Sequence, residues 1–217
     1  LKVPFDRDEN NELATCKEAA HSTNRIIHAK DATGKAIHDA LLAATEKNPL
    51  INLFANHTAI DLITPDHHST DKLSVYKKKS CVGAYVLDSQ NKQVKRILSK
   101  FTVLASGGLG QLFLHSSNPK GSRGDGIAMA NRAGARIINT EFVQFHPTTF
   151  YKKGAPNFLI SEAVRGAGAT LVDAKERPFM YKYAPEWGDL APRDVVSRSI
   201  FNEMTSTDSP CVYLDLK

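Results

Sequence analysis

The sequence is poor in cysteine and lacks long apolar runs. Its only cysteines, Cys16, Cys81 and Cys211, lie far apart and form no CxxC or CxxH spacing. This pattern argues against a disulfide framework and against a structural zinc site. We therefore predict no metal and a reduced, cytoplasmic setting. No apolar stretch approaches the roughly 20 residues that cross a bilayer, and no signal peptide is recognisable, so we expect no membrane contact.

Basic residues exceed acidic ones, but they are not concentrated. The chain has 28 Lys and Arg against 23 Asp and Glu, a formal net charge of +5, and its longest basic run is the short segment 77–79. Nucleic-acid binders usually gather such charge on one face with interleaved aromatic residues. We therefore expect no nucleic-acid partner, and a surface potential that favours small acidic ligands.

The 217 residues, 41% of them hydrophobic, suit a globular protein with one sizeable core or two small domains. The chain begins at Leu1 and stops at Lys217 directly after a strand-like run. We interpret it as an internal piece of a longer protein.

Local patterns predict a mixture of helices and strands. Strands are expected at residues 51–55, 59–63, 101–105 and 211–216, a hairpin at 81–87 and 94–98, and a polar exposed insertion at 64–79. Helices are expected at residues 34–45, 124–134, 161–166 and 192–204. Near Asn139 the strand-rich pattern gives way to aromatics, prolines and paired charges, so we predict a domain boundary there.

Three features beyond that boundary could carry chemistry. His146 lies between an aromatic residue and a proline, Glu162 and Arg165 are neighbours on one predicted helical face, and Arg193 precedes Asp194 at a helix start. Alone, each is more often structural: a packed histidine, a weak exposed ion pair, or a surface pair or cap. Together, one histidine and several arginines can bind two carboxylates, because the guanidinium fork matches a carboxylate.

These features stand in three longer motifs. EFVQFHPT at 141–148, EAVRG at 162–166 and APRDVVSR at 191–198 occur in this order, preceded by ASGG at 105–108, SNP at 117–119 and GDGIA at 124–128. The series resembles the family of fumarate reductase, succinate dehydrogenase and L-aspartate oxidase flavoproteins, and it extends over nearly the whole chain.

The resemblance implies an α/β fold, α+β overall. Residues 1–139 would be part of a Rossmann-type FAD-binding domain that lacks its Gly-rich N-terminal unit, which normally cradles the FAD pyrophosphate. Residues 140–217 would be part of an α+β capping domain. FAD would be the cofactor, in an incomplete site, and the piece by itself is expected to be inactive.

The resemblance also implies roles for particular residues. His146 and Ser161 would bind the substrate, Arg193 would move the proton, and Glu162 with Arg165 would form a relay to it. Contacts with FAD would come from Thr58, Ala59, Gly107, Gly108 and Asp125.

Glu18 decides between branches of the family. The segment KEAAHS at 17–22 resembles the aspartate-oxidising form, in which an acidic residue faces the ammonium group of the substrate, whereas the succinate enzymes carry an uncharged residue there. A carboxylate offsets the desolvation of an ammonium group and repels a purely anionic ligand. Alanines at 19 and 20 replace a usual glycine pair, and Ala167 replaces a usual glutamate.

The activity implied is oxidation of L-aspartate to iminoaspartate, with oxygen or fumarate as electron acceptor and quinolinate synthase acting next in NAD biosynthesis. Two alternatives stay open. One is the flavoprotein subunit of a succinate dehydrogenase or fumarate reductase, with iron–sulfur and membrane partners. The other is that the isolated polypeptide is a non-catalytic domain that binds dicarboxylates weakly or not at all. For Glu18 itself, the alternative is an ordinary solvated loop residue.

Overall fold

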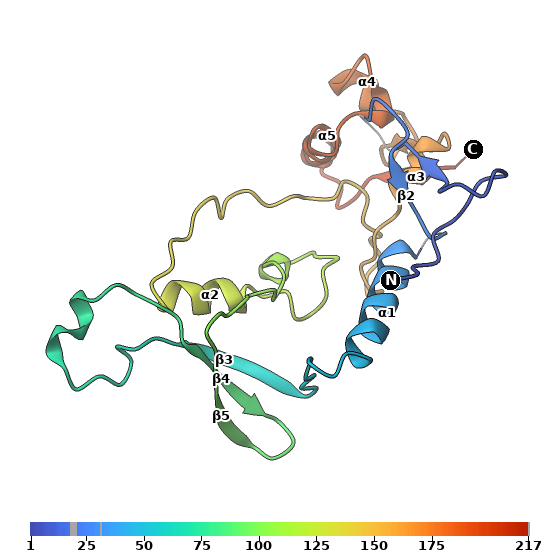
Figure 1. Ribbon diagram of the computed structural model, residues 1–217. Helices are drawn as coiled ribbons and strands as arrows, with labels where there is room; N and C mark the ends of the chain where they lie inside the picture. Colours follow the sequence, from blue (N-terminus) through green and yellow to red (C-terminus); the bar gives the residue numbers. More distant parts are fainter. Residues whose placement is uncertain (18–20, 31, 217) are drawn as a thin grey trace. The chain divides into compact units, whose positions relative to one another are not determined.

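The computed structural model describes residues 1–17, 21–30 and 32–216, which form two compact units (Figure 1). One unit contains residues 1–52 and 144–217, and the other contains residues 53–143. Every strand pairing among the described residues is antiparallel, so the chain itself is α+β. The predicted division of the longer protein at residue 139 stays a prediction.

The unit of residues 53–143 is built on a three-stranded meander. Strands β3 (His57–Ile63), β4 (Gly83–Asp88) and β5 (Gln93–Leu98) pair in the order β3-β4-β5, with an irregularity between Ala59 and Asp61. The predicted hairpin and the strand before it are confirmed. Two 3₁₀ turns complete the unit's short elements, η1 (Lys72–Tyr76) in the polar insertion and η2 (Gly110–Leu112).

The loop between β4 and β5 is fixed by Asp88, which is only 2% exposed. Its carboxylate accepts hydrogen bonds from the backbone N–H groups of Gln90 and Asn91, both 3.1 Å, from the Asn91 amide at 2.8 Å and from Lys95 Nζ at 2.7 Å. Lys95 and then Asn91 hold the pKa of Asp88 well below its usual range. The loop is therefore tied to the strand that it follows.

Helix α2 (Asp125–Arg132) packs on β3. Gly124 precedes it with a left-handed backbone, φ +80°, and Arg132 Nε donates to Asp61 Oδ2 at 2.9 Å. A Cβ atom on Gly126 would lie 1.9 Å from Ser106 Oγ and 3.0 Å from Ser106 Cβ, so a larger residue there would displace the Ser106 side chain. The predicted helix is confirmed.

Two predicted strands are wrong. Residues 51–54 form no regular structure and lead through a turn at 55–56 into β3, and residues 101–105 form no strand either. Phe101 and Val103 are 88% and 87% exposed. A strand needs a neighbour to satisfy its backbone groups, and neither segment has a ladder partner within the part of the chain that the structure describes.

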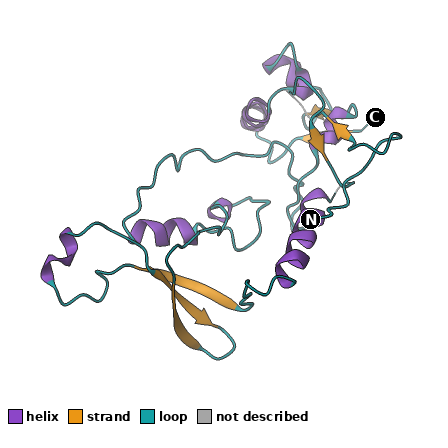
Figure 2. Cartoon of the chain, in the orientation of Figure 1, coloured by secondary structure: helices purple, strands orange, loops and turns teal. Residues whose placement is uncertain are grey.

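The other unit is mostly short elements (Figure 2). In chain order they are β1 (Thr15–Cys16), β2 (Ile26–Ile27), α1 (Thr33–Glu46), α3 (Glu162–Gly166), β6 (Thr170–Val172), α4 (Met180–Tyr183), η3 (Gly188–Leu190), α5 (Arg193–Thr207) and β7 (Tyr213–Asp215). The predicted helices α1, α3 and α5 and the final strand are confirmed, whereas β6 and α4 were not predicted. None of the described helices is long and apolar enough to cross a membrane.

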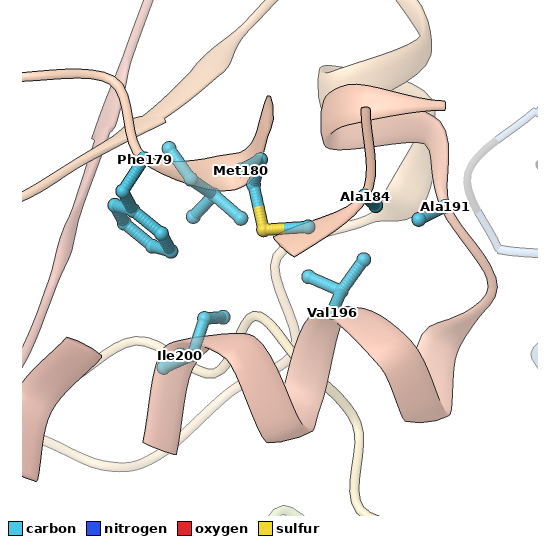
Figure 3. Packing of buried hydrophobic residues seen from close by; sticks show 7 residues of the cluster. Phe179, Met180, Ala184, Ala191, Val196 and Ile200 are labelled. Carbon is cyan, nitrogen blue, oxygen red and sulfur yellow. The ribbon is translucent and has the colours of Figure 1, made fainter. Parts of the chain in front are cut away.

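The core of this unit lies between α4 and α5. Figure 3 shows Val196 and Ile200 extending from α5 toward Met180 on the facing segment. The full buried cluster is Leu171, Phe179, Met180, Ala184, Ala191, Val196 and Ile200. Packing against α4 and β6 thus fixes α5, whose first residue is Arg193.

The Met180→Ala variant is expected to lower the free energy of unfolding by about 2–5 kcal/mol, because it leaves a cavity in the core. Met180 is 1% exposed and packs within this cluster. The check is chemical denaturation of the full-length protein, with Met180→Leu as a control of similar volume that costs below about 1.5 kcal/mol. Equal midpoints for the two variants would contradict the packing described.

Candidate active site

Helix α3 places an acidic and a basic side chain in the interior. The Glu162 and Arg165 side chains are 7% and 0% exposed, and Glu162 Oε1 lies 3.6 Å from Arg165 Nη2. That separation makes an ion pair and exceeds hydrogen-bond length. The expected adjacency on one helical face is confirmed, but the view of the pair as exposed is wrong. Arg165 Nη1 also donates to the carbonyl oxygen of Asp189 in η3, which helps to keep the guanidinium inside.

Arg193 joins this pair from the start of α5. Pro192 occupies the N-cap position, where its missing N–H costs nothing. Arg193 Nε donates to Glu162 Oε2 at 2.8 Å, and its side chain is 36% exposed. The alternative of a mere surface pair does not describe Arg193, because it binds the buried Glu162, while Asp194 pairs with Arg198 at 2.7 Å. Glu162 therefore lies between a buried guanidinium and a partly exposed one.

This three-residue cluster carries a surplus of positive charge. Two guanidinium groups surround one carboxylate, and burial lowers the pKa of Arg165 while Glu162 opposes that shift. Arg165 Nε is buried without a hydrogen-bond partner among the described residues. Arg193 is partly exposed, and its partner Glu162 already pairs with a second cation, Arg165. Arg193 is therefore a favourable place for a carboxylate supplied by a ligand.

His146 is half-buried next to this cluster. The Thr148 N–H group donates to His146 Nδ1 at 3.3 Å, so we assign the ring proton to Nε2. Burial lowers the pKa of His146, and the positive charges of Arg193 and Arg165 add to the effect. At neutral pH the ring is therefore uncharged, with Nε2–H as its donor.

Ser161 is the N-cap residue of α3. Its Oγ accepts a hydrogen bond from the Ala163 N–H group at 3.2 Å, which satisfies one of the free donors of the helix start. A hydroxyl can accept and donate at once. The Ser161 proton is thus still available to a ligand while the residue caps the helix.

The residues expected to contact FAD all lie in the unit of residues 53–143. Gly107 has a left-handed φ of +75°, the Gly108 carbonyl accepts from Gly124 N–H at 3.1 Å, and Asp125 is in the first turn of α2. A Cβ atom on Gly108 would meet nothing within 4 Å. Open glycine backbone beside a helix start suits the close approach of FAD.

Thr58 and Ala59 belong to β3, the strand on which α2 packs. The residues expected to contact FAD therefore all belong to one unit. The residues expected to bind the substrate and move the proton belong to the other: His146, Ser161, Glu162, Arg165 and Arg193. Glu18 lies outside the described residues. Among the residues that the structure describes, no three or more potential metal ligands lie together.

Sequence reasoning missed three supporting residues in the unit of residues 1–52 and 144–217, the expected substrate unit. Thr148 orients the His146 ring, Asp189 supplies a carbonyl to Arg165, and Ser197 binds the backbone beside His146. Of the three, only Thr148 belongs to the same sequence motif as the residue that it contacts, His146. Asp189 and Ser197 act across 24 and 52 residues, so no local spacing could reveal them.

Comparison with known families and proteins gives a consistent result. The FAD binding domain family matches residues 1–217. The chain is 47% identical to L-aspartate oxidase of Pseudomonas aeruginosa and 43% identical to L-aspartate oxidase of Vibrio cholerae, in each case over 99% of this chain. It spans about 40% of the length of these relatives.

Solved structures give the same picture of the fold. A mutant of the E. coli quinol fumarate reductase FrdA matches 99% of this chain and 37% of its own, with a TM-score of 0.86 at 24% identity. Mycobacterium smegmatis Sdh1 in complex with UQ1 matches 99% of this chain and 36% of its own, with a TM-score of 0.72 at 30% identity.

Proposed function

Because the chain belongs to the FAD binding domain family, we propose that the full-length protein is an FAD-dependent L-aspartate oxidase that converts L-aspartate to iminoaspartate. The observation that carries the proposal is the bonding of Glu162 to both Arg193 and Arg165 beside a neutral His146. The identity of 42–47% to several L-aspartate oxidases supports it.

The substrate unit offers a charge pattern suited to a dicarboxylate. His146 Nε2–H and the Ser161 hydroxyl supply neutral donors, and the partly exposed Arg193 guanidinium supplies positive charge. Hydrogen bonds to a charged acceptor are stronger than those between neutral groups. These residues bind and orient the two carboxylates of the substrate in the proposed complex.

The proton path begins at Arg193. FAD, when bound, would supply the hydride acceptor, and Arg193 would take up the proton that the substrate loses as its guanidinium passes a proton to Glu162. An arginine can take part in proton transfer only with help, because its pKa is ordinarily above 12. Glu162 Oε2, which accepts the Arg193 Nε hydrogen bond at 2.8 Å, is the group that provides this help. Arg165 holds Glu162 from the other side.

Selection of L-aspartate over succinate is assigned to Glu18, whose carboxylate would pair with the substrate ammonium group. The same proposal has the protein in the cytoplasm, using oxygen or fumarate as acceptor and supplying iminoaspartate to quinolinate synthase for NAD biosynthesis. The rival is a succinate-oxidising or fumarate-reducing flavoprotein.

The deciding experiment uses the full-length protein loaded with FAD. Its visible spectrum is recorded without oxygen after addition of L-aspartate or succinate. Bleaching of the flavin by L-aspartate alone supports the proposal, whereas bleaching by succinate alone supports the rival. The Glu18→Gln variant is expected to lose discrimination between the two ligands, and unchanged discrimination would remove Glu18 from its role. Bound flavin that neither compound reduces would argue against both activities.

The His146→Phe variant is expected to bind succinate at least about tenfold more weakly, because a hydrogen bond to a charged group is lost. Its pH dependence is a second check. Since the pKa of His146 is lowered, the ring is expected to gain its proton only below its ordinary value of about 6.5. Any pH-dependent change in the ratio of the succinate dissociation constants of His146→Phe and the wild type, measured by flavin absorbance, is thus expected to be centred below about pH 6.5. A change in that ratio centred near 6.5 would contradict the assignment.

A further inference from the structure

The segment that carries His146 is held on one side by its pairing with the entry to α3. Thr148 Oγ1 donates to the Ile160 carbonyl at 3.0 Å, and the Ile160 N–H group donates to the Thr148 carbonyl at 2.9 Å. Ile160 directly precedes Ser161, the N-cap of α3. These two bonds fix the His146 segment relative to α3, and so relative to Glu162.

On the other side the same segment is held by α5. Ser197 Oγ donates to the Phe145 carbonyl at 2.8 Å, a contact between residues 52 positions apart. Ser197 follows Arg193 by four residues on α5, so the two lie on one helical face, a turn apart. One hydroxyl thus links the residue before His146 to the helix that begins with Arg193.

The Ser197 hydroxyl does not donate to the acceptor that is usual for a serine inside a helix. Serine and threonine inside helices commonly donate to the carbonyl four residues earlier. Ser199 does so to Val195, and Thr205 does so to Phe201, each at 2.8 Å. Ser197 instead donates to the Phe145 carbonyl, outside the helix. Its hydroxyl therefore serves a tertiary contact, where it can influence His146.

We propose that Ser197 is a positioning residue for dicarboxylate binding, which sets the place of His146 relative to Arg193. The inference rests on the proposed function. Ser197 acts through the backbone of Phe145 and needs no contact with the ligand. Without its hydroxyl, the His146 segment keeps its bonds to Ile160 but loses this hydrogen bond to α5. The distance between the His146 Nε2–H group and the Arg193 guanidinium is then no longer fixed. A ligand with two carboxylates requires these two groups at a fixed distance.

The test uses the full-length, FAD-loaded protein and its Ser197→Ala variant. Alanine favours helix formation, so α5 is preserved. The loss of one hydrogen bond to a neutral carbonyl is expected to raise the dissociation constant for succinate, and KM for L-aspartate, by about three- to tenfold. The expected change in kcat is smaller than that in KM, and FAD content is expected to stay the same.

Ser206→Ala is the matched control, because Ser206 Oγ on the same helix donates to the Glu203 carbonyl within α5. It is expected to leave both constants unchanged. A second pair, Ser197→Thr and Ser197→Val, differs by little more than the hydroxyl, and only the threonine variant is expected to retain wild-type binding.

Three results would overturn the inference: an unchanged succinate constant in Ser197→Ala, equal binding by the threonine and valine variants, or weakened binding that merely parallels loss of FAD or of thermal stability. Wild-type protein that binds succinate but never oxidises L-aspartate would sink the proposed function alone. Wild-type protein that binds neither compound would sink both.

Discussion

Replacing Arg193 with glutamine in the full-length, FAD-loaded protein is expected to lower kcat for L-aspartate by about 10²- to 10⁴-fold, the usual contribution of a positioned proton-transfer group. Glutamine keeps a donor near Glu162 but has no charge and no exchangeable guanidinium proton. The residues proposed to contact FAD lie in the unit of residues 53–143, which does not contain Arg193. The flavin content is therefore expected to stay at the wild-type level. Anaerobic flavin reduction in a stopped-flow instrument measures the effect on the chemical step directly.

The control for this variant is Arg198→Gln on the next turn of α5. Arg198 pairs with Asp194 on the surface, the two side chains being 71% and 66% exposed, and such pairs contribute little. Its kcat is expected to match that of the wild type. If Arg193→Gln reduced the flavin as fast as Arg198→Gln, Arg193 would have no part in proton transfer.

Replacing Glu162 with glutamine is expected to lower the free energy of unfolding by about 3–5 kcal/mol, because it removes the carboxylate that acts most strongly on the buried Arg165 guanidinium and leaves only the weaker effect of Asp189. Glu162 is the carboxylate between Arg165, which is fully buried, and Arg193. The neutral amide cannot offset either charge. Activity is expected to fall as well, since Arg193 loses the acceptor that holds its Nε. Chemical denaturation, monitored by circular dichroism, measures the stability change.

Glu203→Gln provides the comparison. Glu203 is also buried, at 6% exposure, but its partners are Tyr183 and Lys182, whose side chain is 62% exposed and can turn to water. This variant is expected to be less destabilised and to retain kcat. Equal losses of stability in the two variants would mean that pairing with two guanidinium groups does not make Glu162 more important for stability than Glu203.

The elements that the sequence predicts correctly have local signals. Helix α1 has an extended helical pattern, α5 starts after a proline, and β4 and β5 are joined by a short polar loop. The two wrong strands, residues 51–55 and 101–105, have the composition of strands. The composition of a segment indicates how well its residues fit into a β-sheet. It does not show whether another strand lies beside the segment to pair with it. The unpredicted β6 and α4 have three and four residues, too few for a period to be recognised.

The candidate site was predictable in part. Spacing alone places Glu162 and Arg165 on one face of a helix, and the structure agrees. Burial of that pair could not be deduced, because it depends on η3, which reaches Arg165 from 24 residues away. The bond between Arg193 and Glu162 spans 31 residues and follows from tertiary packing. Before the structure, the shared chemistry of one histidine with several arginines, and then the family resemblance, were the grounds for predicting that these residues act together.

The lock that Asp88 forms on the β4–β5 loop also bears on the order in which the chain folds. The hydrogen bonds from Gln90, Asn91 and Lys95 join residues no more than seven positions apart, so they can form while the chain is still being synthesised. Hairpins with such local contacts close within about 1–10 μs. The bond between Glu162 and Arg193, in contrast, must wait until α5 has been made. The β4–β5 hairpin is therefore expected to form before Glu162 can pair with Arg193.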